Sequence, residues 1–341
     1  MGFYPQSLMR HLGIIVNPMS GRDVRRVTAK ASTHSHQNKQ QQVTRLILGA
    51  LNHGVERIFL ANEPFRINER ATENLIERDR VEILSFPLTH SAADTSHMAE
   101  AMWAAGCRTF IVLGGDGTSR IVAQTLPDAT LMPISTGTNN VFPQLVEASV
   151  AGAAAGLICS QQLASQDHCY RCKQIHVKVN GGHAHGGVED MALIDAVMLS
   201  NEQMGSLLPF APENILQVFL TRAEPASVGM SPIGGYVMPC GAQDTFGVSV
   251  TCGEPAVTRI SVPLSPGLYG EIPIKRYQRV ELGVPHSIQG PGILAFDGDR
   301  SISLGPDDRA EILINNDGPW IIEPASVMQA AATAGLFDIT T

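Results

Sequence analysis

The chain has 341 residues, of which 44% are hydrophobic and 16% are charged, a balance typical of folded globular proteins rather than disordered ones. Its 24 Lys and Arg residues against 32 Asp and Glu residues give a net charge of -8, which argues against a general nucleic-acid binder because such proteins are basic. No apolar run approaches the roughly 20 residues that cross a bilayer. We therefore expect a soluble cytoplasmic protein with neither nucleic-acid nor membrane partners.

The first 150 residues alternate short apolar runs with segments of helical period. The runs that predict strands cover residues 12–16, 57–61, 81–86, 109–114 and 129–135. The segments that predict helices cover residues 43–54, 67–79 and 93–106. Strands that alternate with helices form parallel sheets covered on both faces, so this part of the chain predicts a doubly wound α/β domain.

The pattern changes after about residue 155. Short runs of alternating apolar and polar residues, separated by Gly and Pro, predict an antiparallel β-rich domain. The last stretch is typical of a helix, with Pro324 in its first turn. We therefore expect an α/β domain over residues 1–153, a β-rich domain over 154–322 and a C-terminal helix within 323–341 that packs back on the first domain.

Small polar loops follow three of the predicted strands. They are NPMSG (17–21), GGDGTS (114–119) and STGTNN (135–140). In a parallel sheet these strand ends meet at one edge, which is where such sheets bind ligands. Glycine lets the backbone approach a ligand closely, and the N–H groups at the start of the following helix favour an anion. The three loops together indicate a phosphate-binding site.

Asp116 is a carboxylate inside the glycine loop. The loop has neither the lysine of a P-loop nor the glycine spacing of a dinucleotide fold. An aspartate there would repel a bare phosphate, unless it takes a proton from an attacking hydroxyl or holds a metal ion that offsets the phosphate charge. The alternative is a tight strand–helix turn with a capping aspartate, and the loop alone leaves both interpretations open.

Several motifs in the same order resemble the NAD kinase/diacylglycerol kinase superfamily over almost the whole chain. Besides the three loops, they are MALIDAVML (191–199), PASVGMSPIGG (225–235) and FDGDRSISLGPDDRAEILI (296–314). Within the superfamily, the loop sequences are most similar to the acetoin catabolism protein X branch. The resemblance implies an α/β domain followed by a β domain, ATP and Mg²⁺ in the cleft between them, NAD as a possible substrate, and a homo-oligomer.

The resemblance also implies roles for individual residues. Asp116 matches the catalytic aspartate that activates the acceptor hydroxyl. Asp195 and Asp297 match positions on the acceptor side. The positions that match the nucleotide and phosphate loops are Asn17, Ser20, Gly21, Gly114, Gly115, Gly117, Thr118, Thr138, Asn139 and Asn140.

One departure from the superfamily concerns the acceptor. NAD kinases carry an Asn-Glu pair in the central strand, where this chain has Ile194 and Asp195. Isoleucine cannot hydrogen-bond a dinucleotide, and losing such a buried contact costs about 1–3 kcal/mol of recognition. Three functions therefore stay open: phosphorylation of NAD to NADP, phosphorylation of a small hydroxylated metabolite linked to acetoin breakdown, and nucleotide sensing with little turnover. ATP and polyphosphate both stay open as donor.

Cys169 and Cys172 form the one organised cysteine pair of the sequence, in HCYRC. A structural zinc site usually has a second matching pair, which the sequence lacks. The pair is therefore interpreted as free thiols in a surface loop that leads into a strand, and no metal ligand is assigned, while metal binding and redox activity of the pair stay open as alternatives.

Overall fold

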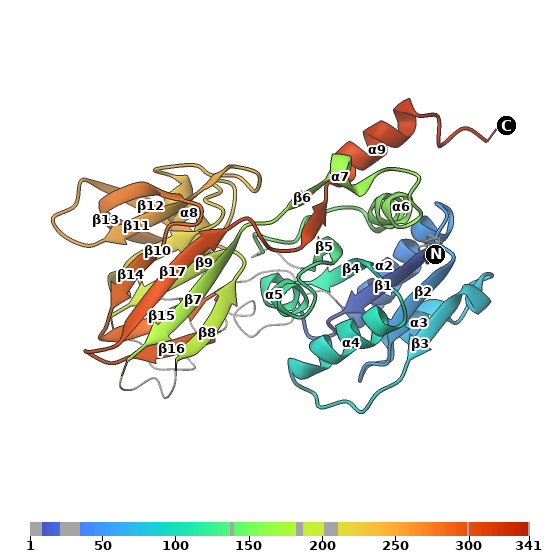
Figure 1. The fold of residues 1–341 in the computed structure, drawn as a ribbon, viewed down its shortest axis with the longest axis horizontal. Helices are drawn as coiled ribbons and strands as arrows, with labels where there is room; N and C mark the ends of the chain where they lie inside the picture. The colour runs from blue at the N-terminus through green and yellow to red at the C-terminus, as the bar shows by residue number, and fades with distance from the viewer. Residues whose placement is uncertain are drawn as a thin grey trace, which may run out of the picture.

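The computed structural model describes residues 9–20, 35–136, 140–181, 187–200, 211–298 and 300–339, which form two domains (Figure 1). The first domain is built on a seven-stranded sheet. In spatial order its strands are β3 (Val81–Leu84), β2 (Arg57–Ala61), β1 (His11–Val16), β4 (Thr109–Gly114), β5 (Thr130–Ser135), β18 (Trp320–Ile322) and β6 (Cys169–Arg171). Neighbouring strands are parallel except β18 and β6.

Helices cover both faces of this sheet, because its apolar strands have no polar face to leave in water. One face is covered by α2 (His36–Leu51), α3 (Ile67–Thr72), α6 (Ala148–Cys159) and α9 (Pro324–Thr333). The other face is covered by α4 (Ala93–Ala104) and α5 (Asp116–Thr125). The predicted doubly wound α/β fold is confirmed. Among the described residues, no helix has the length and apolar character needed to cross a bilayer.

Two helices of this domain differ in length from their predictions. The helix predicted over 67–79 ends at Thr72, and only the short 3-10 helix η1 (Arg78–Arg80) follows it. Ile76 there is 96% exposed, so one of the apolar residues that defined the predicted helical period is not buried. Conversely, α2 starts seven residues before the predicted 43, because the Ser35 hydroxyl accepts a hydrogen bond from the Asn38 N–H and caps the helix.

The second domain is a sandwich of two antiparallel sheets, which confirms the predicted β-rich fold. The larger sheet has the order β12 (Thr258–Ser265), β13 (Leu268–Glu281), β11 (Phe246–Cys252), β10 (Ile215–Leu220), β9 (Asp195–Leu199), β15 (Gly292–Phe296) and β16 (Arg300–Leu304). The smaller sheet has the order β14 (His286–Gln289), β17 (Arg309–Asn315), β7 (Gln174–Asn180) and β8 (Val188–Ala192). A core of Ile, Val and Phe side chains fills the space between them. The described part of the chain also contains the short helices α7 (Ser165–His168), η2 (Pro212–Asn214) and α8 (Ser231–Gly235).

The apolar run 191–200 is not one strand. It is divided between β8 and β9, which belong to different sheets, and the chain crosses from one sheet to the other at Leu193 and Ile194. The sequence of this run does not reveal the break, because the side chain that holds the crossing comes from Asp297, 103 residues from Ile194.

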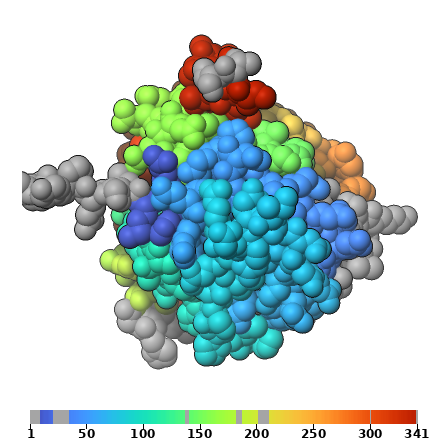
Figure 2. Space-filling view, turned by 90° about the vertical axis from the view of Figure 1, so that its right-hand side faces the viewer, coloured from blue at the N-terminus to red at the C-terminus, as the bar shows by residue number. Residues whose placement is uncertain are grey.

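The expected domain boundaries also need correction. The boundary after residue 153 falls inside α6, and residue 322 ends β18, a strand of the first sheet. Since β6 and β18 both belong to the first sheet, the β domain is inserted between them. Figure 2 shows the C-terminal helix α9 in red on top of the α/β domain, where it packs against α6 through Val327 and Ala331.

The crossing of α2 and α6 depends on two glycines. A Cβ on Gly152 would lie 2.3 Å from the Leu46 carbonyl oxygen, and one on Gly49 would lie 2.4 Å from the Ser149 carbonyl oxygen. We expect Gly152→Ala to lower the free energy of unfolding by about 1–3 kcal/mol, because the backbones must separate. In a helix without this contact the same change stabilises by about 1 kcal/mol.

Urea unfolding measures this effect. Val150→Ala, at an exposed position of the same helix, serves as the control and should change stability by less than about 0.5 kcal/mol. A Gly152→Ala variant as stable as the wild type would contradict the close crossing.

Candidate active site at the carboxyl edge of the parallel sheet

The loops after β1 and β4 meet where the strand order reverses, which is the position at which open α/β sheets bind ligands. The Asn17 N–H donates to the Leu113 carbonyl at 3.1 Å, and its side-chain amide donates to the Thr118 hydroxyl at 2.8 Å. The loop after β1 is therefore hydrogen-bonded directly to the end of β4 and to the glycine loop. Both loops are among the segments that were predicted to bind nucleotide.

A buried lysine of α2 binds the backbone carbonyls of the loop after β1. The Lys39 ammonium group donates to the carbonyl oxygens of Asn17 and Pro18 at 2.8 Å and of Ser20 at 2.6 Å. Within the loop, the Asn17 side-chain oxygen accepts the N–H groups of Met19 and Ser20. Sequence reasoning missed Lys39, because it lies in the polar stretch STHSHQNKQQQ that is typical of a solvated segment. It is fully buried instead.

Replacing this lysine should loosen the loop. We expect Lys39→Met to lower the free energy of unfolding by about 1–3 kcal/mol, because the loop carbonyls lose a charged donor in a buried site. The same change at the exposed Lys178 is the matched control and should have no effect above about 0.5 kcal/mol. Thermal unfolding of the two variants distinguishes them, and equal melting temperatures would rule out a supporting role for Lys39.

The glycine loop passes from the end of β4 into the first turn of α5, where Gly117 follows Asp116. A Cβ on Gly114 would lie 2.6 Å from the Thr118 Cβ atom, and one on Gly115 would lie 2.9 Å from the Asn140 side-chain oxygen. The Asn140 amide in turn donates to the Ser135 hydroxyl at 2.8 Å. Only glycine leaves room for Thr118 and Asn140 at these positions. Gly21, Thr138 and Asn139 lie outside the described residues.

Asp116 is held at the start of α5 by backbone donors. Its carboxylate accepts the Phe142 N–H at 2.8 Å and the Val141 N–H at 3.2 Å. Burial raises the pKa of Asp116 to about 7, and the neighbouring Asp297 contributes in the same direction. A carboxylate with such a pKa can exchange a proton near neutral pH, which is what a general base requires. Sequence reasoning could not find these donors, because any residue supplies a backbone N–H.

Asp297 lies opposite, in the turn after β15, with a φ of 45° in the left-handed region that aspartate tolerates. Its carboxylate accepts the N–H groups of Leu193 at 2.9 Å, Ile194 at 2.8 Å and Asp195 at 3.2 Å. The Arg120 Nε atom lies 3.7 Å from it, and both side chains are buried. Burial raises the pKa of Asp297, whereas the three N–H groups and Arg120 act in the opposite direction. This carboxylate therefore joins β8, β9 and α5.

Ile194 and Asp195, which stand where NAD kinases have an Asn-Glu pair, have different surroundings. Ile194 packs in the apolar core that β4 and α5 share. Asp195 begins β9 and is also buried, and its backbone carbonyl accepts the Asp297 N–H at 3.2 Å. The isoleucine that departs from the superfamily pattern is thus a core residue.

Arg222 was absent from the sequence-based site. It follows the apolar strand β10, and its guanidinium donates to the Val141 and Phe142 carbonyls and to the Tyr170 hydroxyl. A polar residue directly after a buried strand is the signal that identified the other loops, and it could have identified Arg222. This residue brings a positive charge from the β domain to the Asp116 site.

The cysteine pair is not in a surface loop. Cys169 begins β6 and is half-buried, and Cys172 just after this strand is buried. Burial raises the pKa of both thiols to about 12, so both remain protonated at neutral pH. Both thiols are free, and no group of three or more His, Cys, Asp or Glu side chains in the described part of the chain could hold a metal ion.

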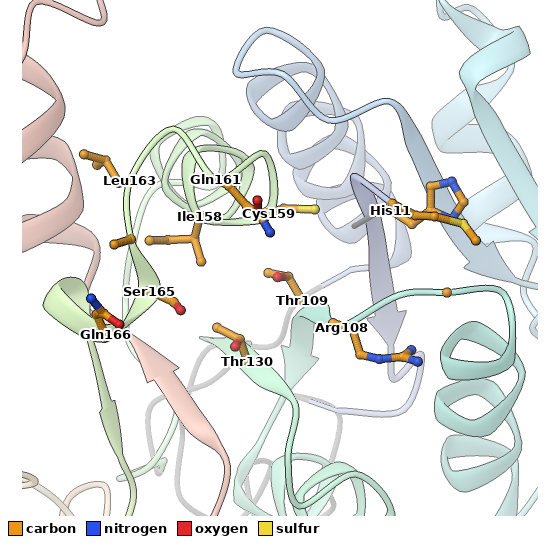
Figure 3. A pocket seen from close by; sticks show the side chains of 13 residues that line it. His11, Arg108, Thr109, Thr130, Ile158, Cys159, Gln161, Leu163, Ser165 and Gln166 are labelled. Carbon is orange, nitrogen blue, oxygen red and sulfur yellow. The ribbon is translucent and has the colours of Figure 1, made fainter. Parts of the chain in front are cut away.

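A cavity of about 920 Å³ lies at the opposite edge of the sheet (Figure 3). His11, Thr109 and Thr130, the first residues of β1, β4 and β5, face it together with the segment that follows α6. None of the predicted site residues that the structure describes lines this cavity. The loops and the Asp116 carboxylate, whose pKa is raised by burial, converge at the carboxyl edge, and this edge is therefore the candidate active site.

Comparison with known proteins first shows the class of protein to which the fold belongs. Residues 12–161 match the model of the ATP-NAD kinase N-terminal domain, and residues 173–317 match that of the acetoin catabolism protein X C-terminal domain. The crystal structure of yeast NADH kinase complexed with NADH has the same fold, with a TM-score of 0.58 at 10% identity, over 98% of this chain and 90% of that one. The fold is that of an NAD kinase-like two-domain protein.

Sequence identity then defines the family. The acetoin catabolism protein X of Cupriavidus necator is 31% identical over 330 residues, which cover 94% of this chain and 92% of that protein. The chain belongs to the acetoin catabolism protein X family. The resemblance noted from the loop motifs is thereby confirmed.

Proposed function

We propose that the protein transfers a phosphoryl group from ATP to a hydroxyl group, with Asp116 as the general base. The observation that carries this proposal is the Asp116 carboxylate, which is held by two backbone N–H groups beside a glycine loop and has its pKa raised to about 7. In its ionised form it accepts the proton of the acceptor hydroxyl as the oxygen attacks the γ-phosphorus.

The glycine loop and the loop after β1 are proposed to hold the phosphates. Gly114 and Gly115 leave the backbone accessible, and the α5 N-terminus favours a negative charge. Asn17, Ser20, Gly117, Thr118 and Asn140 lie around this position, while Lys39 keeps the first loop in place. Magnesium, which arrives with ATP as part of the substrate, neutralises phosphate charge.

NAD is the first candidate for the acceptor, because the fold is that of the NAD kinases and a structure with this fold contains NADH. Asp195 is proposed to contact a ribose hydroxyl of the acceptor, and Asp297 to shape the same pocket. A small hydroxylated metabolite is the second candidate, and a specific observation favours it. Ile194 is packed in the core where NAD kinases have a polar contact, and the curated relative is named for acetoin catabolism.

The test is NADP formation by the full chain with Mg-ATP and NAD, repeated with polyphosphate as donor and with small alcohols related to acetoin as acceptors. Formation of NADP establishes an NAD kinase. Phosphorylation of a small alcohol without NADP establishes the second candidate. ATP binding without turnover on any acceptor contradicts the proposed reaction and leaves a nucleotide-binding sensor as the function.

A further inference from the structure

Arg222 connects the two domains at the backbone segment that binds Asp116, the proposed general base. It comes from the β domain, is 6% exposed, and reaches the segment after β5 in the α/β domain. One guanidinium nitrogen lies 3.3 Å from the Val141 carbonyl oxygen and 3.5 Å from that of Phe142. The other lies 3.2 Å from the Tyr170 hydroxyl, and the guanidinium sits 4.8 Å from the centre of the Phe142 ring.

The peptide group between Val141 and Phe142 is held at both ends. Its carbonyl oxygen accepts from Arg222, and its N–H donates to the Asp116 carboxylate at 2.8 Å. A positive charge on the carbonyl side polarises a peptide group and strengthens its N–H as a donor, because hydrogen bonds in series reinforce one another. Arg222 and Asp116 therefore act on opposite ends of the same dipole.

We infer that Arg222 is a positioning residue, which orients Asp116 through the Val141–Phe142 peptide and thereby makes the orientation of the base depend on the docking of the β domain. This inference rests on the proposed function in so far as Asp116 is the base. Neither the glycine loop nor the segment 296–314 that resembles the superfamily contains Arg222, so the inference adds a residue that the resemblance does not supply.

The charged groups around Asp116 give the inference a measurable consequence. Asp297, from the turn after β15, raises the pKa of Asp116, and Arg222 lowers it. Arg120 of α5 faces Asp297. Removing Arg222 takes away an opposing charge and weakens the N–H donors, and both changes raise the pKa of Asp116 further. Because the base must be ionised, activity then requires a higher pH.

The experiment compares the pH profiles of kcat/KM for the wild type and Arg222→Met. We expect the acidic limb to move up by about one pH unit and kcat at pH 7 to fall about tenfold, with the KM for ATP unchanged within about twofold. Arg222→Lys keeps the positive charge but loses the planar guanidinium. Its acidic limb should therefore lie close to the wild-type pH, whereas its kcat should be only partly restored. Arg279→Met, at an exposed arginine over the Phe246 ring, is the matched control and should change neither.

A folded Arg222→Met variant with the wild-type profile would overturn the inference. If the methionine variant does not fold, Arg222→Gln replaces it, with a limb shift in the same direction expected. If the wild type phosphorylates no acceptor, the proposed function fails, and a ¹³C NMR titration of Asp116, assigned by its absence in Asp116→Asn, decides on Arg222 alone. A higher pKa of Asp116 without Arg222 supports the inference, and an unchanged pKa overturns it.

Discussion

Asp116→Asn is expected to lower kcat by about 10²–10⁴-fold and to leave the affinity for ATP within a few-fold of the wild type. Asparagine has the same shape, and its side-chain oxygen can still accept the N–H groups of Val141 and Phe142. It cannot accept the proton of an attacking hydroxyl, so the loss falls on the chemical step rather than on nucleotide binding.

Steady-state kinetics measures the loss, and calorimetric titration with Mg-ATP measures the affinity. Asp128→Asn, at an exposed aspartate after α5, is the matched control and should retain full activity. Full activity of Asp116→Asn would remove this residue from the mechanism.

The pH profile of the wild type provides a second measure of the same residue. Because the pKa of Asp116 is raised to about 7, the group is protonated below this pH and ionised above it. Activity should therefore rise with pH through about 7 and fall away on the acidic side. A profile that stays flat down to pH 5 would show that the base is a group with an ordinary carboxyl pKa.

Asp297→Ala is expected to lower the free energy of unfolding by about 3–5 kcal/mol. The change removes the carboxylate that faces the buried Arg120 and leaves the Leu193, Ile194 and Asp195 N–H groups without their acceptor. Both losses occur in a buried site, where the loss of an opposing charge and of the acceptor for three N–H donors is costly. Asp297→Asn, which keeps the acceptor oxygen but not the charge, should lie between alanine and the wild type.

Urea unfolding measures the effect against an exposed ion pair. Glu254 pairs with Arg259 at the surface, so Glu254→Ala should cost no more than about 1 kcal/mol. If Asp297→Ala costs as little as Glu254→Ala, the junction of β8, β9 and α5 does not depend on this carboxylate.

Much of the fold could be predicted because the strands of the α/β domain are short, continuous apolar runs separated by helical segments. The helix α6 was missed because its sequence, ASVAGAAAGLIC, has almost no polar face and so lacks a helical period. The strands β6 and β18 are three residues long and join the first sheet only through distant partners. Local pattern carries no information on such pairings.

The site could be predicted where local sequence determines it. The glycine loop and the loop after β1 are recognisable from residue types at strand ends, and the structure brings Asn17 and Thr118 together there. Lys39 and the Phe142 N–H could not be found in the same way. Each makes a contact that involves a backbone group of a segment distant in the sequence. Backbone groups are common to nearly all residue types, so the sequence of that segment does not indicate the contact.

The insertion of the β domain between β6 and β18 has a consequence for how the protein can move. The chain leaves the first sheet at Cys172 and returns at Gly318, and these two connections are bonded to each other. The Gly318 N–H donates to the Cys172 carbonyl at 3.1 Å, and the Cys172 N–H donates to the Pro319 carbonyl at 3.0 Å. A Cβ on Gly318 would lie 2.5 Å from the Cys172 sulfur, so glycine keeps the pair close.

A two-stranded tether of this kind resists twisting more than bending, because rotation of one strand about the other breaks the bonds between them. Separation of the two domains would therefore bend this ribbon, and it would also break the contacts that Ile194, Asp297 and Arg222 make with the α/β domain. The two ends of the inserted segment lie side by side, so the chain can hold a whole β domain between β6 and β18 without separating these two strands in the first sheet.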